Sequence, residues 1–187
     1  AIMNHVQTRI MRSTGAGVVS LLPELPEDEV TDGWVWVDAR AGGGDFDELA
    51  ALTTGLKLDA VAVRDAAHDL DLPKVDDFGH HLLVVLHGIR DDRVETYEVD
   101  CFVTDRYLVT VHGEASPSLD AVWERLQDST DLASGGVDEL LARIADVLTR
   151  RLLAVVDAFD DAADVLLHKA LTADSDLLGE LTAVRSD

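Results

Sequence analysis

The chain has 187 residues, of which 47% are hydrophobic, and it carries a formal net charge of −22 at pH 7. Nucleic acids and anionic membrane surfaces both attract proteins rich in lysine and arginine, so this charge argues against either class of partner. It is typical of a surface that attracts cations, although general surface acidity would give the same charge. The single cysteine, Cys101, excludes a disulfide framework, and no run of 18 apolar residues predicts a membrane-spanning helix.

The first third of the chain predicts three strands, a loop and a short helix. Residues 5–13 alternate as in an edge strand, residues 18–22 suggest a second strand, and residues 34–38 alternate tryptophan and valine as in a third. The prolines between residues 22 and 33 indicate a loop. Asp45 is a suitable N-cap for a helix that ends near Thr53, before Gly55.

The middle of the chain predicts a short helix followed by four strands. The helical spacing of apolar residues begins at Leu58, and Pro73 ends that helix because the residue before a proline avoids the α region. The strands are expected at residues 75–77, 82–86, 94–104 and 107–112. The apolar run at 82–86 is typical of a strand covered on both faces, and short turns join the last three strands into an antiparallel meander.

The last third predicts helices. Ser116 and Pro117 open one helix, and a linker at 134–136 separates it from a much longer helix that runs from Val137 to about Thr172. A helix of that length protrudes or pairs with another helix. Residues 173–175 predict a turn, and residues 176–184 the start of an antiparallel partner helix.

These elements predict an α/β protein. We expect a mixed, largely antiparallel sheet sandwiched by helices in a domain at residues 1–134. A second part at residues 135–187 would hold the long acidic helix and its partner helix.

Several short motifs occur in an order that is known from one protein family. They lie at residues 34–38, 63–65, 72–78 and 108–112, and the long acidic helix follows them. Together they resemble the cytoplasmic domain of the CorA family of divalent metal ion transporters. The resemblance implies a regulatory, metal-sensing domain of a magnesium or cobalt transporter, without catalytic activity, at the cytoplasmic face of the inner membrane.

The resemblance also implies two metal ligands. In that family, regulatory Mg²⁺ binds between neighbouring subunits of a homopentamer. Asp65 matches the second member of an acidic pair on the small helix, and Asp146 matches an aspartate on the long helix. The first member of the pair is Arg64 here, and its fixed positive charge cannot ligate a metal. The remaining ligand, an aspartate of the stalk helix, would lie beyond Asp187. The sequence lacks the Gly-Met-Asn pore motif and both membrane helices of the family, so the resemblance implies either a soluble fragment of a transporter or a free-standing relative.

The long helix carries further acidic candidates. At 100° per residue, several aspartates and His168 fall on the same stripe as Asp146. Such a stripe is tolerated if it is solvated, if it binds hydrated Mg²⁺, or if it faces a basic partner. The additional candidate ligands on this stripe are Asp157, Asp161 and Asp164.

Each of the two principal candidates also has a simpler interpretation as half of an ion pair. Asp65 could pair with Arg64 or Lys57. Asp146 could pair along its helix with Arg150 or Arg143.

The alternatives to magnesium regulation have weaker signals. His80 and His81 would face opposite sides of a strand and could not easily share a zinc ion, although some CorA relatives carry zinc. The sequence lacks GxSxG, P-loop and GxGxxG motifs, so we do not expect an enzyme. A small acidic hydrolase would need carboxylates that converge in a pocket. An acidic module that docks a basic protein surface, with metal incidental, remains the main alternative.

Overall fold

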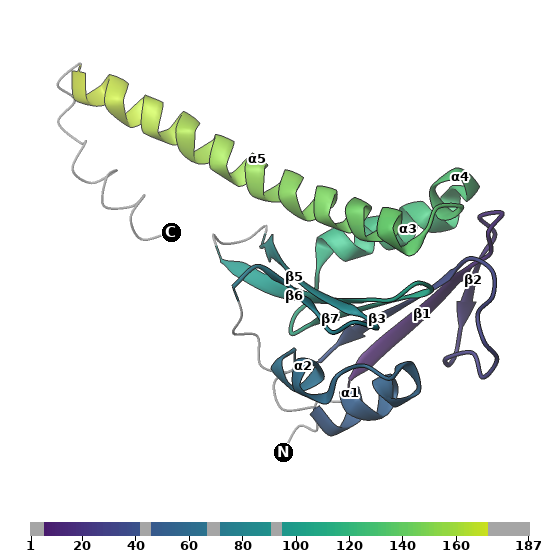
Figure 1. Ribbon diagram of the computed structural model, residues 1–187. Coiled ribbons are helices and arrows are strands. Elements are labelled where there is room, and N and C mark those ends of the chain that lie inside the picture. The colour runs from purple at the N-terminus through teal and green to yellow at the C-terminus, as the bar shows by residue number, and fades with distance from the viewer. Residues whose placement is uncertain (1–5, 42–45, 67–71, 91–94, 172–187) are drawn as a thin grey trace.

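The computed structural model describes residues 6–41, 46–66, 72–90 and 95–171. At its centre is a seven-stranded sheet with the strand order β2-β1-β3-β7-β6-β5-β4 (Figure 1). Neighbouring strands are antiparallel, except that β3 and β7 run parallel. The strands are β1 (Gln7–Ser13), β2 (Val19–Leu22), β3 (Trp34–Arg40), β4 (Lys74–Asp77), β5 (Leu82–Ile89), β6 (Thr96–Val103) and β7 (Tyr107–His112).

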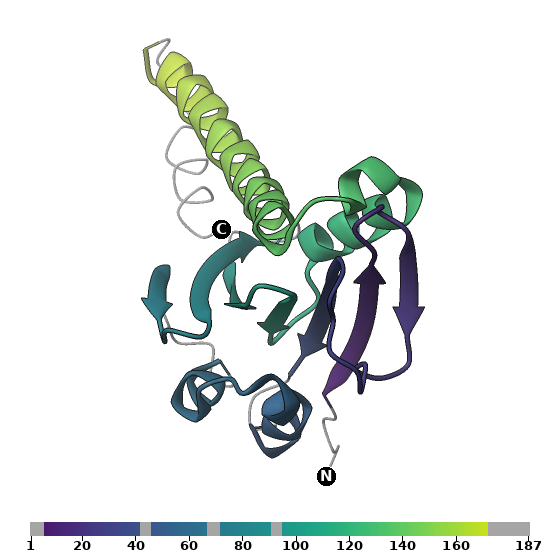
Figure 2. The same cartoon turned by 45° about the vertical axis from the view of Figure 1, so that its right-hand side comes forward.

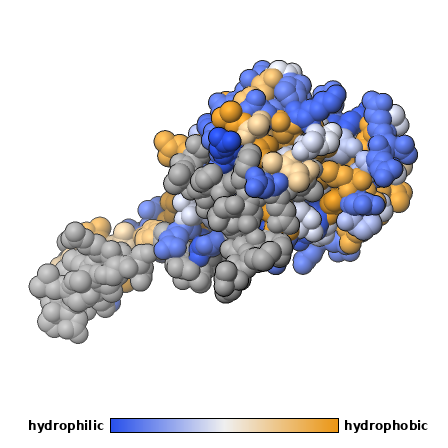
Figure 3. Space-filling view, turned by 90° about the horizontal axis from the view of Figure 1, so that it is seen from below, coloured by the Kyte–Doolittle hydropathy of each residue, from blue (hydrophilic) through white to orange (hydrophobic). Residues whose placement is uncertain are grey.

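Helices cover both faces of the sheet, as Figures 1 and 2 show. One face carries α1 (Phe46–Thr53), a 3-10 turn η1 (Thr54–Leu56) and α2 (Ala60–Asp65). The other carries α3 (Pro117–Asp128), α4 (Thr130–Ala133) and α5 (Val137–Leu171). The arrangement confirms the predicted α/β class, with a mixed and largely antiparallel sheet between helices. Over the α1–α2 face, apolar and polar side chains are interspersed (Figure 3).

Two hydrophobic cores result, one on each face, and β3 supplies both. Val35 and Val37 point into the α1–α2 core, whereas Trp34 and Trp36 point into the α3–α5 core. The ring of Trp36 lies 5.0 Å from that of Trp123 on α3. Full burial of one large apolar side chain stabilises a fold by about 1.5 to 3 kcal/mol, so the alternation along β3 ties both helix layers to the sheet.

The meander and the covered strand agree with the sequence predictions. β5, β6 and β7 pair in order and antiparallel. In β5, Leu83 and Val85 belong to the α1–α2 core, while Val84 and Leu86 pack against the α3–α5 core. The run is therefore covered from both sides from Leu83 to Leu86, as its apolar character predicts, whereas Leu82 at its start is 37% exposed.

Side chains that accept hydrogen bonds from the first turn mark the starts of α2 and α3. Asp59 caps α2 by accepting from the backbone N–H groups of Val61 and Ala62. Ser116 caps α3 by accepting from that of Leu119. The predicted cap Asp45 lies outside the described residues.

Two details of the sequence prediction are wrong. The strand at 5–13 is not an edge strand, because β1 pairs with β2 on one side and with β3 on the other. Gly17, with φ of 76°, closes the turn toward β2 and so adds an extra strand outside β1. The short helix begins at Ala60 rather than Leu58, since Asp59 caps it there.

α5 is the longest element, and its two parts have different surroundings. Val137, Leu140, Ile144 and Leu148 are buried in the α3–α5 core. Beyond them the helix extends away from the sheet, as expected from its length (Figure 1). Leu153 in that part is 54% exposed. The division of the chain at residues 134 and 135 stays a prediction, and residues 173–187 lie outside the described part. Within the described residues, no helix has both the length and the apolar character needed to cross a bilayer.

Candidate functional site

Asp65 is exposed at the last position of α2. Neither Arg64 nor Lys57 pairs with it, and it has no hydrogen bond or ion pair with any residue that the structure describes. The carboxylate is therefore available to a ligand or a second chain.

Asp146 has the partner that its helical spacing allows. Arg150 Nε donates to both carboxylate oxygens, at 2.9 and 2.8 Å, and these hydrogen bonds raise the pKa of the arginine. The pair is exposed, so salt screens it, and a competing cation can replace it at little cost. Of the two expected pairings, the one with Arg150 is confirmed.

The two predicted ligands lie far apart within one chain. α2, with Asp65, covers one face of the sheet, and α5, with Asp146, covers the other (Figure 1). A single chain cannot place both carboxylates on one ion, whereas contact between two copies could bring opposite faces together.

The other acidic candidates lie on the extended part of α5 and are exposed: Asp157, Asp161 and Asp164. Across residues 6–41, 46–66, 72–90 and 95–171, no set of three His, Cys, Asp or Glu side chains is arranged to hold a metal. A magnesium ion that keeps most of its water would need only one or two of these carboxylates.

The histidine prediction is wrong in its local structure. His80 and His81 lie in the turn between β4 and β5, where Gly79 has φ of 83°, and not in a strand. Their ring centroids are 4.6 Å apart, with an angle of 71° between the ring planes, so the rings do not lie on opposite sides. His81 is buried and stacks on Phe78, and burial, with a smaller contribution from the charge of His80, lowers its pKa. His80 instead contacts the backbone carbonyl of Lys57, at 2.6 Å.

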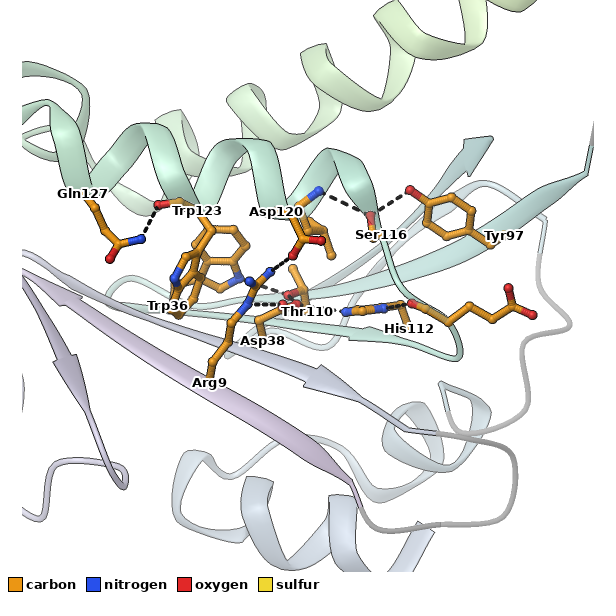
Figure 4. Close-up of polar contacts among 12 residues, drawn as sticks. Arg9, Trp36, Asp38, Tyr97, Thr110, His112, Ser116, Asp120, Trp123 and Gln127 are labelled. Atoms are coloured by element: carbon orange, nitrogen blue, oxygen red, sulfur yellow. Dashed lines mark hydrogen bonds and ion pairs between the residues drawn. The ribbon is translucent and has the colours of Figure 1, made fainter. Parts of the chain in front are cut away.

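A buried polar network on the α3–α5 face was not predicted as a site. Its centre is Asp38 on β3, which accepts hydrogen bonds from Thr110 Oγ1 (2.5 Å) and Arg9 Nε (2.8 Å) and contacts His112 Nε2 (3.2 Å) (Figure 4). Thr110 in turn accepts from Trp36 Nε1, at 2.9 Å. The strand register brings these residues together, since both Arg9 and Thr110 lie directly opposite Asp38.

Arg9 extends this network from the sheet to α3. Its Nη2 atom lies 2.8 Å from Asp120, and its guanidinium lies over the ring of Trp123 at 4.4 Å. Burial alone would raise the pKa of Asp38, but the hydrogen bond and charge of His112, with Thr110 and Arg9, outweigh it and hold that pKa below its ordinary value. The network therefore keeps a charged carboxylate inside the fold.

The sequence did carry a signal for part of this network. Asp38 follows Trp34 and Trp36 at every second position of a strand, so it must share their buried face. A carboxylate on such a face requires partners. Thr110 and His112 have the same spacing on β7, but only the strand order shows that the two strands are neighbours.

Comparison with known proteins identifies the family. The model of a family described as CorA-like Mg²⁺ transporter protein matches residues 31–187. The chain belongs to this family. Asp65 and Asp146, the two carboxylates that the resemblance implies as metal ligands, both lie within the matched and described residues.

Individual relatives agree with this assignment. The chain is 28% identical over 144 residues to YfjQ of Bacillus subtilis (strain 168), whose provisional name is metal ion transporter; the match covers 75% of this chain and 44% of that protein. The CorA magnesium transporter from Methanocaldococcus jannaschii has a similar fold (TM-score 0.73, 15% identity, all of this chain and 57% of that one). So does the cytoplasmic domain of ZntB from Vibrio parahaemolyticus (TM-score 0.67, 12% identity, 88% of this chain and 66% of that one). The chain spans about half the length of the first of these relatives.

Proposed function

We propose that this CorA-like chain is the cytoplasmic, metal-sensing part of a transporter for Mg²⁺ or Co²⁺. Residues 1–134 would form its α/β domain, and residues 135–187 the helical extension toward the membrane. Membership of the family supports transport of a divalent metal, and the similarity to the soluble domain of CorA from Methanocaldococcus jannaschii supports a place outside the membrane. A zinc-transporting member of the family is the alternative cargo.

One observation supports a regulatory role. Asp65 and Asp146 are exposed on opposite faces of one chain, so they can meet only across a contact between two copies. In a homopentamer, every contact between neighbours would pair one Asp65 with one Asp146. A hydrated Mg²⁺ ion there would offset two facing negative charges while it kept several of its waters.

This arrangement couples the cytosolic Mg²⁺ concentration to subunit contact. With Mg²⁺ bound, the neutralised carboxylates favour closely packed subunits and a closed pore. When Mg²⁺ leaves, the facing carboxylates repel each other, in a chain that already carries −22 charges. Arg150 would have to release Asp146 before that carboxylate could accept a metal-bound water.

A calorimetric titration of Mg²⁺ into the full-length oligomer tests the proposal. Asp65→Asn and Asp146→Asn should each weaken binding at least tenfold, because each removes one of very few ligands. Glu124→Gln, which removes an exposed carboxylate on α3, should leave the affinity unchanged and serves as the control. Full affinity in both aspartate variants would exclude this site. The isolated chain should bind Mg²⁺ only at about millimolar concentration, since it supplies one or two ligands.

A second function, docking of a basic protein, is favoured by the extended part of α5. There Asp157, Asp161 and Asp164 are exposed beside Phe159, which is 39% exposed. A partner captured through this surface should be released by salt and be indifferent to Mg²⁺. Capture that requires Mg²⁺ would instead support metal sensing.

A further inference from the structure

A cleft of about 220 Å³ lies where the parallel strands β3 and β7 end, between the start of β1 and the start of α3. Arg40 and His112, the last residues of the two strands, lie opposite each other here. The crevice beyond the carboxyl ends of parallel strands is the usual place for ligands in α/β sheets.

The inner wall of this cleft is buried and fixed by hydrogen bonds. Asp38, His112 and Ser116 line it and are at most 6% exposed. His112 Nε2 contacts a carboxylate oxygen of Asp38, and Nδ1 contacts the backbone carbonyl of Glu114. Both ring nitrogens of His112 are therefore held by contacts within the fold.

Two guanidinium groups, of Arg9 and Arg40, and two carboxylates, of Asp38 and Asp120, line the cleft. Arg9 lies between Asp38 and Asp120 and bonds to both. Arg40 also lines the cleft, and it has no hydrogen bond or ion pair with any residue in the described ranges. A guanidinium that lines a cleft without a bonded partner in the described ranges is unexpected in a chain of net charge −22.

We propose that this cleft binds a small oxyanion, of the phosphate or short dicarboxylate type, with Arg40 as its main charged contact. The planar guanidinium matches the geometry of two oxygen atoms on one phosphate or carboxylate group. Gln7, which lines the same cleft, adds an amide N–H₂ donor beside it. A metal cation is disfavoured because the inner carboxylate, Asp38, already bonds to Arg9, Thr110 and His112.

Thermal unfolding of the protein tests the site, with inorganic phosphate and malonate as probes and sodium chloride at equal ionic strength as the reference. For a dissociation constant of about 1 mM, 10 mM of the bound anion should raise Tm by about 4 °C. The probe with the larger rise distinguishes phosphate chemistry from carboxylate chemistry. Arg40→Gln should lose more than half of the rise.

Arg125→Gln is the matched control. Arg125 is likewise exposed and without a partner among the described residues, but it lies near the other end of α3. This variant should keep the full rise, which separates binding in the cleft from general salting-out by phosphate. If chloride raises Tm as much as both probes do, or if Arg40→Gln responds as the unaltered protein does, the proposal is wrong.

A second measurement needs no substitution. In a long-range ¹H–¹⁵N spectrum of the seven histidines, phosphate or malonate should move the ring signals of His112, while those of the distant His168 stay in place. Ring signals of His112 that do not move at 20 mM of either anion would overturn the assignment.

Discussion

Asp38 and His81 are both buried and titratable, but they lie in different surroundings. The carboxylate of Asp38 bonds to Arg9, Thr110 and His112, whereas neither ring nitrogen of His81 has a hydrogen-bond partner in the described part of the chain. The two surroundings therefore favour opposite forms: the charged form of Asp38 and the neutral form of His81. The pKa of Asp38 stays low because its partners favour the charged form, and that of His81 falls because burial favours the neutral one. A buried polar group strengthens a fold only to the extent that it is paired.

The largest expected effect comes from removing the paired group. Asp38→Ala should destabilise the protein by about 3 kcal/mol or more, because it leaves Arg9 and His112 without their shared carboxylate. Urea unfolding measures this, with Asp161→Ala as an exposed control that should change stability by less than about 0.5 kcal/mol. Equal losses in both variants would show that burial of Asp38 does not matter.

A smaller loss of stability should follow when the carboxylate of Asp38 remains and one of its hydrogen-bond donors is removed. Thr110→Val keeps the size of the side chain but removes the hydroxyl that joins Trp36 Nε1 to Asp38. Because the indole N–H is then buried without an acceptor, we expect a loss of about 1 to 3 kcal/mol in urea unfolding. Thr104→Val, in the partly buried turn before β7, removes a hydroxyl that bonds only to turn backbone and should cost less.

The dependence of stability on pH in the acid range should show that Asp38 is paired in the folded protein. Since its pKa is lower in the folded protein than in the unfolded chain, the carboxylate contributes stability that is complete above its ordinary pKa, near 4, and is lost as the pH falls through the lowered value. The urea midpoint should therefore fall more steeply below pH 4 in the unaltered protein than in Asp38→Asn. Parallel curves for the two proteins would mean that the network does not hold the charge.

The smallest effect should come from the unpaired histidine, and it should have the opposite sign. His81→Phe replaces a ring without partners by one that can stack on Phe78, so we expect a gain of up to about 1 kcal/mol at pH 6. The lowered pKa of His81 means that the unaltered protein loses stability as the pH falls below about 6.5, since the unfolded chain then binds the proton more tightly. The variant should lack this part of the pH dependence. Destabilisation with unchanged pH dependence would indicate that the imidazole has a partner.

The sequence predicts the elements well because their signals are local. The alternation of Trp34 to Asp38, the apolar run at 82–86 and the uninterrupted helical spacing after Val137 each depend on neighbouring residues, and all three elements are present. The edge-strand prediction fails because the position of a strand in a sheet depends on distant pairing. The histidine prediction fails because a turn at Gly79 lies between β4 and β5.

The candidate sites also differ in whether they depend on local sequence or on distant pairing. Positions of Asp65 and Asp146 follow from motif order, and their exposure agrees with a surface role, but their meeting across two copies stays a prediction. The Asp38 network requires β3 and β7 to be neighbours although 72 residues separate Asp38 from Thr110. No local pattern specifies that pairing, so the network and the cleft beside it emerge only from the fold.

The partial support of α5 has a mechanical consequence. Only the part up to Leu148 rests on the sheet, and the residues from there to Leu171 continue for about 35 Å at 1.5 Å per residue. A rigid rod held at one end magnifies any tilt of its base, so that a rotation of about 5° displaces the far tip by about 3 Å. A tilt of α5 that is too small to disturb the packing around Ile144 would thus displace the distal end of the helix by about the diameter of an atom.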